Sequence, residues 1–402
     1  MEILIEKMVY GGAGLGRTVE GKAVFVPYVL PGELVDVRIV QEKKGHIHAE
    51  LIEVLKPSDK RVVPFCKHFS QCGGCAYQHM SYADQLIAKQ EIIQETLTRT
   101  CKLPEFQIKP IIPSANEKYY RNHIQFHMDA DGKSGFLKSG SHELINIEEC
   151  FLPEKELLTL RENLLFEDAS GLNGIDLRSG DEDPLVIFHG EEQPPQLEVD
   201  FSINLLFEND GNPMILSGDE HIMKTINGRG FRVSADTFFQ TNDLQTERLL
   251  NEVLDAIKSA AGGLLLDVYC GVGLFSAFAA PMFDQVIGIE IAPLACEDFA
   301  ENLDEFDNVA LYQGKAEEVL PTLNVPADVM IVDPPRAGID RKAMDAMIKI
   351  APNHIVYVSC DLSTLARDLN RLMEGDYKLI SFQPIDMFPH TQHIESIVVL
   401  TK

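Results

Sequence analysis

From residue 230 to the C-terminus, short and almost fully apolar runs alternate with longer amphipathic segments. The apolar runs have the length and the Val, Ile and Leu content of strands that are buried on both faces. These runs cover residues 264–269, 286–290, 309–312, 328–333 and 354–360. One helix is predicted before them, from an N-cap at Asp243 to about Ile257, and others between them. The alternation predicts an α/β domain at residues 230–402 with a doubly wound parallel sheet.

The first 57 residues alternate apolar and polar positions over short runs. Turn signals containing glycine or proline separate these runs, which cover residues 2–9, 22–27, 33–40 and 48–55. The spacing predicts an OB-like β-barrel at residues 1–57. Such barrels often bind nucleic acid, although a barrel without that role fits the pattern equally well. The stretch from Gly11 to Gly16 is interpreted as a turn and not as a dinucleotide site, because a strand pattern follows it instead of a helix.

Residues 58–229 combine both kinds of pattern. A helical period runs from Ser81 to about Arg99. Strand-like runs then follow among Gly, Asp and Pro turns, at residues 123–128, 185–188 and 202–207. We therefore predict a mixed α/β central domain.

Three cysteines lie close together at the start of this central region, namely Cys66, Cys72 and Cys75. Gly73 and Gly74 let the backbone turn tightly enough to aim the last two thiols at one metal centre. Zinc and a cubane iron–sulfur cluster both require a fourth ligand. The spacing does not decide between these metals, and the candidate fourth ligands are Cys101, Cys150, His68 and His79.

Charge and composition limit the partners. The net charge of −27 argues at first against a nucleic-acid partner, and a solvated acidic surface is the simpler explanation. However, the first 150 residues hold 18 basic and 19 acidic side chains, against 17 and 43 in the remainder. A polyanion would therefore meet least repulsion at the first 150 residues. No signal segment or apolar run of about 18 residues occurs, which predicts a cytoplasmic protein without membrane spans.

The first strand of the C-terminal domain leads into Asp267-Val-Tyr-Cys-Gly-Val-Gly273, and the second ends at Glu290. Two glycines allow the backbone to pass close to a ligand, and Gly271 is one of them. An acid about 20 residues further on can accept the ribose hydroxyls of a nucleoside cofactor. S-adenosylmethionine fits this acidic setting better than a dinucleotide does. The alternative is that Gly271 and Gly273 only form a tight turn and that Glu290 is a solvated strand end.

Two further strands end on reactive side chains. Asp333-Pro-Pro-Arg336 follows the fourth strand, where the prolines hold the loop rigid and the carboxylate can accept an amide or imide N–H. Cys360 ends the fifth strand, where a cysteine is either a nucleophile or a small buried apolar residue. Near the C-terminus, Glu395 could act as a base, while a metal site at His390 and His393 is weakly indicated.

Together these stretches resemble the S-adenosylmethionine-dependent RNA uracil-C5 methyltransferases, in particular the rRNA-type members with a TRAM domain and an iron–sulfur cluster. The likeness covers almost the whole chain. The matching motifs are Gly11-Gly-Ala-Gly-Leu-Gly-Arg17, Phe25-Val-Pro27, Leu30-Pro-Gly-Glu33, Phe239-Gln-Thr-Asn242, Asp267–Gly273, Glu290, Asp333-Pro-Pro-Arg336, Ser359-Cys360 and His390-Thr-Gln-His-Ile-Glu395. The resemblance implies a TRAM barrel, a central domain carrying a cluster and a Rossmann-like class I methyltransferase domain. Its four cysteine matches, which imply the ligands of a [4Fe–4S] cluster and leave Cys101 out, are Cys66, Cys72, Cys75 and Cys150.

The resemblance also implies a covalent mechanism on a flipped or single-stranded uridine. Cys360 would attack C6 of the uracil, and Glu395 would later remove the C5 proton. Asp333 would lie at both cofactor and uracil. The implied cofactor contacts are Gln240, Tyr269 and Glu290. Leu362 and Leu274 depart from the family pattern, and the second leaves one cofactor contact in doubt.

Large-subunit (23S) rRNA is the favoured substrate, and tRNA is the alternative. A non-catalytic RNA-binding or assembly factor and a nitrogen methyltransferase are the other candidates, but neither has a use for Cys360. No feature indicates an obligate protein partner.

Overall fold

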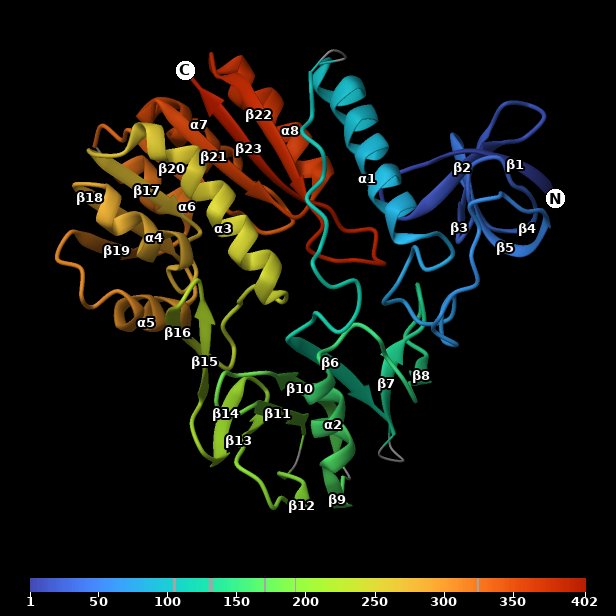
Figure 1. Ribbon diagram of the computed structural model, residues 1–402, viewed down its shortest axis with the longest axis horizontal. Helices are drawn as coiled ribbons and strands as arrows, with labels where there is room; N and C mark the ends of the chain where they lie inside the picture. Colours follow the sequence, from blue (N-terminus) through green and yellow to red (C-terminus); the bar gives the residue numbers. More distant parts are fainter. Residues whose placement is uncertain (104–105, 130–132, 170, 192, 324) are drawn as a thin grey trace.

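The computed structural model describes residues 1–103, 106–129, 133–169, 171–191, 193–323 and 325–402. Figure 1 shows a barrel at the N-terminal end, a mixed α/β region below it and a helix-covered sheet that carries the C-terminus. Helix α1 (Tyr82–Thr96), which one π-helical turn (Leu97–Cys101) extends, lies between the barrel and the C-terminal sheet.

The N-terminal barrel is closed, in the order β1-β2-β3-β5-β4. Its strands are β1 (Glu2–Met8), β2 (Ala13–Arg17), β3 (Ala23–Pro27), β4 (Leu34–Glu42) and β5 (His46–Lys56). The prediction of a turn from Gly11 to Gly16 is wrong for its second half, which is β2. Gly14 and Gly16 face the crowded interior, where a Cβ atom at Gly16 would lie 2.3 Å from Cγ2 of Ile3. Glycine is therefore needed here so that two strands can approach closely, and not only for a turn.

The middle of the chain forms a seven-stranded sheet in the order β14-β13-β11-β10-β6-β7-β8. Helix α2 (Lys155–Asn163) lies in this region, together with the small pair β9 (Leu165–Asp168) and β12 (Gln196–Glu198). The three predicted strand-like runs coincide with β6, β11 and β13. The sheet strands are β6 (His123–Met128), β7 (Ser134–Leu137), β8 (Leu144–Asn146), β10 (Leu172–Arg178), β11 (Leu185–Gly190), β13 (Asn204–Asn209) and β14 (Asn212–Ser217).

A hairpin of β15 (His221–Ile226) and β16 (Arg229–Ser234) leads into the C-terminal sheet, whose order is β19-β18-β17-β20-β21-β23-β22. The first five strands in this order are parallel, and the last two pair antiparallel. Its strands are β17 (Leu264–Val268), β18 (Gln285–Glu290), β19 (Val309–Gln313), β20 (Val329–Val332), β21 (His354–Ser359), β22 (Lys378–Ile385) and β23 (Glu395–Thr401). Its helices are α3 (Asp243–Ile257), α4 (Leu274–Ala279), α5 (Pro293–Asn302), α6 (Ala316–Val319), α7 (Arg341–Ile350) and α8 (Leu362–Glu374).

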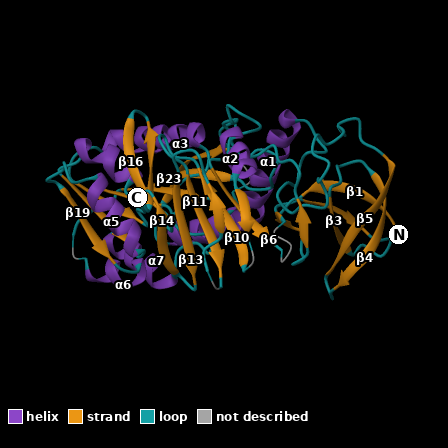
Figure 2. Ribbon diagram, turned by 90° about the horizontal axis from the view of Figure 1, so that it is seen from below, coloured by secondary structure: helices purple, strands orange, loops and turns teal. Residues whose placement is uncertain are grey.

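Successive residues of the central strands enter two different apolar cores, one on each face of the sheet. Leu266, Met330 and Ile355 belong to a core that also contains residues of α1, α7 and α8. Leu265 and Val356 belong to the opposite core, beside α3, α4 and α5. Figure 2 shows helices on both sides of the strands. The doubly wound α/β sheet is thus confirmed.

Two local predictions in this region differ from the structure. The N-cap of α3 is Asn242, whose side chain accepts a hydrogen bond from the amide of Gln245, and not Asp243. Asp243 instead forms an ion pair with Lys224 at 2.5 Å. Strand β22 was not predicted, because its first half is partly exposed and Pro384 lies within it.

The division into residues 1–57, 58–229 and 230–402 stays a prediction. Met8 and Leu30 of the barrel are buried in the same apolar core as the helices of the C-terminal sheet. No helix among the described residues is long and apolar enough to cross a membrane.

Candidate active site and cysteine-lined cavity

The predicted site residues of the C-terminal region gather at one edge of the sheet. Val268, Val332 and Tyr357 lie side by side in neighbouring parallel strands, so the loops that follow them leave the sheet together. The amide of Asp333 donates to the carbonyl of Val268 at 3.3 Å, which ties the Asp-Pro-Pro loop to the glycine loop. Such an edge is where open α/β sheets bind their ligands.

Strand register brings Cys360 and Glu395 together at this edge. β23 runs antiparallel to β21, and Ser359 pairs with Ser396. Cys360 therefore follows the last residue of one strand where Glu395 begins the other. The thiol and the carboxylate come from opposite chain directions but meet at the same end of the sheet.

Buried carboxylates surround the thiol. Burial, and after it the nearby Glu395 and Asp333, raise the pKa of Cys360 to about 11, while Arg336 opposes the shift. Glu395 is 3% exposed, and its burial holds the pKa of its carboxyl well above the usual range. Burial, together with Asp267, raises the pKa of Asp333 to about 7. The thiol is thus protonated near neutral pH, and a cation at this site would favour the thiolate.

The glycine loop has the strained backbone that close approach to a ligand requires. Tyr269 has φ 65°, Gly271 has φ 53° and Gly273 has φ 91°. A Cβ atom at Gly273 would also lie 2.4 Å from Cδ1 of Leu303. Leu274, which departs from the family pattern, packs into the apolar core beside this loop.

Two acids border the glycine loop. Glu290 accepts hydrogen bonds from the amides of Gly271 at 3.0 Å, Ile291 at 2.7 Å and Ala292 at 2.8 Å. Asp267 is fully buried, and its Oδ2 accepts the hydroxyl of Ser276 at 2.6 Å. Asp267 Oδ1 has no hydrogen-bond partner among the described residues. Burial raises the pKa of Asp267 to about 6, although the bond to Ser276 opposes the shift.

Gln240 lies apart from these strand ends, in the segment between β16 and α3. Its carbonyl accepts a hydrogen bond from Asn122 Nδ2 at 3.1 Å. Within the described ranges, no hydrogen bond joins its side chain to Cys360, Asp333 or Glu395. The structure therefore brings together the other predicted residues of the C-terminal region, but does not by itself join Gln240 to them.

Helix α1 holds the loop that leads to Glu395. Lys89 and Asp386 form an ion pair at 2.6 Å, and both side chains are fully buried. Gln85 Nε2 lies 3.0 Å from His390 Nδ1, and the amide of His390 donates to Gln85 Oε1 at 3.0 Å. His390 is thus part of a hydrogen-bonded network that ties this loop to α1. Sequence reasoning missed Gln85 and Lys89, because two polar residues four apart on a helix do not reveal that their face is buried.

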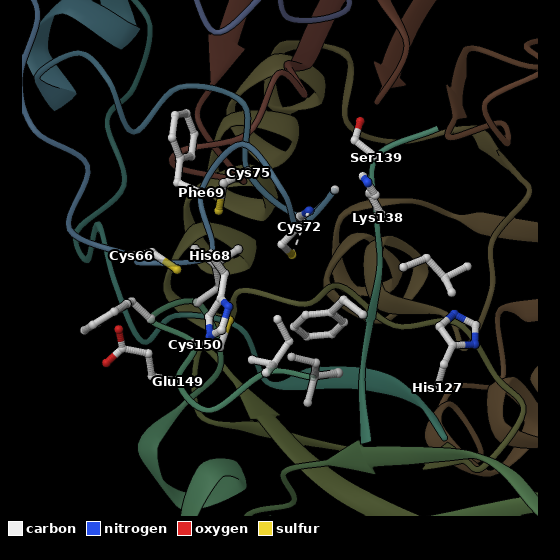
Figure 3. A pocket seen from close by; sticks show the side chains of 18 of the residues that line it. Cys66, His68, Phe69, Cys72, Cys75, His127, Lys138, Ser139, Glu149 and Cys150 are labelled. Carbon is white, nitrogen blue, oxygen red and sulfur yellow. Dashed lines mark hydrogen bonds between the residues drawn. The ribbon is translucent and has the colours of Figure 1, made fainter. Parts of the chain in front are cut away.

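The four predicted cluster ligands border one cavity of about 670 Å³. Figure 3 shows the thiols of Cys66, Cys72 and Cys75 around this opening, with His68 and Cys150 beside them. The cavity lies between the cysteine loop and strands β6 and β7, and Arg121 and Lys138 also line it. Cys101 is absent from its lining and instead donates to the carbonyl of Ala366.

All four thiols are free, and burial raises the pKa of each of them. The pKa reaches about 12 at Cys75 and about 11 at Cys150, where the neighbouring thiols contribute to the shift. The amide of Gly74 donates to Cys72 Sγ at 3.3 Å. Across the described part of the chain, no three His, Cys, Asp or Glu side chains are close enough to hold a single metal ion.

Comparisons with known proteins agree with the site. Residues 1–52 match the model of the TRAM domain, and residues 195–402 match that of the tRNA (uracil-5-)-methyltransferase family. A protein of Halalkalibacterium halodurans named as an RNA methyltransferase is 34% identical, with 100% of this chain and 96% of that protein covered. Another from Streptomyces avermitilis is 33% identical, with coverage of 99% and 97%. The solved structure of Pyrococcus abyssi tRNA (uracil-54, C5)-methyltransferase with S-adenosyl-L-homocysteine is 26% identical, covers both chains fully and has a TM-score of 0.76.

Proposed function

The chain belongs to the tRNA (uracil-5-)-methyltransferase family, which methylates uracil C5 in RNA with S-adenosylmethionine, and from this premise we propose a covalent mechanism centred on Cys360. The observation that carries the proposal is the pairing of Ser359 with Ser396. This pairing sets a thiol and a buried carboxylate beside each other, at the edge that also carries the glycine loop. Uracil C5 is a weak nucleophile until C6 carries an adduct, so the reaction needs such a thiol.

The proposed steps use two side chains of this edge. The Cys360 thiolate bonds to C6, and the electron pair of the C5–C6 double bond moves toward C5 and the C4 carbonyl. S-adenosylmethionine, when bound, would supply the methyl group that C5 takes with this electron pair, and breaking of the sulfur–methyl bond would leave S-adenosylhomocysteine. Glu395 then accepts the C5 proton, the C5–C6 double bond re-forms, and the bond to Cys360 breaks. A carboxylate with a raised pKa is well matched to accepting a proton near neutral pH.

The residues of the glycine loop suit a cationic nucleoside. Gly271 and Gly273 would allow the backbone to approach the ligand, and Glu290 has acceptor capacity left for ribose hydroxyls. The buried Oδ1 of Asp267 lacks a donor among the described residues, which adds negative potential beneath the loop. We place Tyr269 and Gln240 against the cofactor as the family pattern implies, and Asp333 between cofactor and uracil.

We further propose that Cys66, Cys72, Cys75 and Cys150 hold a [4Fe–4S] cluster. In such a cluster each cysteine binds a different iron atom, so the sulfurs lie further apart than around a single ion. The amide directed at Cys72 Sγ suits an anionic sulfur. When bound, the cluster would join the cysteine loop to Cys150 and so stabilise the surface between the barrel and the central sheet.

Two RNA classes are candidates for the substrate. Large-subunit rRNA is favoured because the family members that combine a TRAM barrel with a cluster are mostly rRNA-type enzymes. Transfer RNA is the second candidate, since the solved structure reported above is a tRNA enzyme. The near-neutral first 150 residues are the surface on which either RNA meets least repulsion.

Tritium release from C5-labelled uracil tests both the chemistry and the substrate. We expect release from one of the two transcripts, rRNA or tRNA, in the presence of S-adenosylmethionine, and none with Cys360→Ala. If Cys360→Ala still releases tritium, the covalent mechanism is wrong. If neither RNA reacts while both bind, the non-catalytic alternative gains support.

A further inference from the structure

A side chain of the barrel reaches the loop of the proposed nucleophile. Tyr10 lies in the turn between β1 and β2, and its hydroxyl donates to Asp361 Oδ2 at 2.9 Å. The same hydroxyl oxygen accepts the amide of Leu362 at 3.3 Å. These two partners directly follow Cys360 in the chain. The phenol thus bridges the barrel and the start of α8.

Asp361 organises the turn in which Cys360 lies. Its Oδ1 accepts the amide of Thr364 at 2.8 Å, which makes it the N-cap of α8. On the other side of the thiol, Ser359 Oγ accepts the amide of Asp361 at 3.2 Å. Cys360 is therefore held between a hydrogen-bonded serine and a capped helix, and Tyr10 binds the one carboxylate oxygen that the cap does not use.

The barrel is fixed firmly enough to hold Tyr10 in place. Met8 and Leu30 are buried in the apolar core that also contains Leu362. A Cβ atom at Gly12 would lie 3.2 Å from Cβ of both Ala76 and Gln392, so the turn is packed against the cysteine loop and the loop before Glu395. Tyr10 consequently stands on a rigid base and not on a mobile loop.

We propose that Tyr10 is a positioning residue for the methyl transfer, one that holds Cys360 in line with C6 of the uracil by fixing Asp361. The inference rests on the proposed role of Cys360. A misplaced nucleophile slows attack without weakening substrate binding, so the effect falls on kcat rather than on KM. The barrel then contributes to catalysis as well as to RNA binding.

Tyr10→Phe tests this, because it keeps the ring and removes only the hydroxyl. The readouts are kcat and KM for tritium release and the rate of formation of the denaturant-stable adduct with 5-fluorouridine RNA. We expect kcat and the adduct rate to fall about tenfold and KM to stay within twofold, as for the loss of a hydrogen bond to a charged group.

Tyr377→Phe is the matched control. The Tyr377 hydroxyl donates to the carbonyl of Pro352 at 2.9 Å, just beyond the C-terminal end of α8 and away from Cys360. We expect Tyr377→Phe to lose about as much thermal stability as Tyr10→Phe, while its kcat stays within twofold of the wild type. If Tyr377→Phe slows kcat as much as Tyr10→Phe does, or if Tyr10→Phe retains full kcat, the positioning role is wrong.

Asp361→Asn provides a second route if Tyr10→Phe does not fold, because asparagine still caps a helix. It should slow adduct formation to a similar extent, and the double variant should be no slower than the slower single variant. If the double variant instead loses as much rate as the two single variants combined, the proposal is wrong. If Cys360→Ala still releases tritium, both the covalent mechanism and the positioning role of Tyr10 are wrong. If Cys360→Ala is inactive but Tyr10→Phe keeps the wild-type kcat, only the role of Tyr10 is wrong.

Discussion

The buried ion pair between α1 and the loop before Glu395 gives the sharpest test of what holds the active site together. Lys89 Nζ lies 2.6 Å from Asp386 Oδ1 and 3.2 Å from the carbonyl of Phe388, and neither charged side chain is exposed to water. Lys89→Met keeps most of the apolar stem but removes the ammonium. The variant leaves the Asp386 carboxylate buried without its counter-ion.

The expected cost follows from burial. Removing one partner of a fully buried ion pair costs about 3–5 kcal/mol, because the remaining charge stays desolvated. Lys7→Met is the matched control, since Lys7 pairs with Glu95 of the same helix at the same distance of 2.6 Å. Those two side chains are 44% and 36% exposed, so their loss should cost less than about 1 kcal/mol.

Urea denaturation of both variants measures the difference, with the slope of the transition held to the wild-type value. We also expect Lys89→Met combined with Asp386→Asn to recover part of the loss, because the unpaired charge is then removed. If Lys89→Met costs no more than Lys7→Met, burial is not what makes this pair matter, and the loop before Glu395 is held by other contacts.

Three further predictions concern the chemistry. The rate of adduct formation with 5-fluorouridine RNA should rise between pH 7 and pH 9. Burial and the nearby carboxylates raise the pKa of Cys360 to about 11, so the thiolate fraction increases about tenfold per pH unit in this range. A rate that does not change with pH would contradict this. Glu395→Gln should lower tritium release at least about 100-fold and let a methylated covalent adduct accumulate on denaturing gels, whereas loss of release without an adduct would assign Glu395 to an earlier step. Cys66→Ser and Cys150→Ser should lose iron on metal analysis while Cys101→Ser keeps it, and equal iron loss in all three would remove the assignment of ligands.

Local patterns predict much of this fold. The central parallel strands could be predicted because they are short apolar runs that are buried on both sides, as Leu264–Val268 and His354–Ser359 are. Strand β2 could not be predicted, because its glycines make room for the side chains of Ile3 and Ile5 in a neighbouring strand. The local sequence gives no sign of this contact. β22 was missed for a similar reason, since it is a strand only through its pairing with β23.

Local sequence patterns likewise predicted only part of the active site. The order of strand ends indicated that Asp333 and Cys360 meet at one edge, because parallel strands share their carboxyl ends. The place of Glu395 beside them depends on the register of an antiparallel strand, which no local period encodes. Tyr10 was beyond reach, since 351 residues separate it from Asp361 and a lone tyrosine in a turn carries no signal of its partner.

The apolar core that the barrel shares with the C-terminal sheet affects how the protein folds during translation. Met8 and Leu30 are translated more than 300 residues before Leu362 and Leu365, which belong to the same core. At about 5–20 residues per second, the barrel waits roughly 20–70 s for its partner helix. Throughout that time the nascent chain presents an apolar surface. The barrel is thus translated well before its core is completed, and chaperones have a long opportunity to bind there.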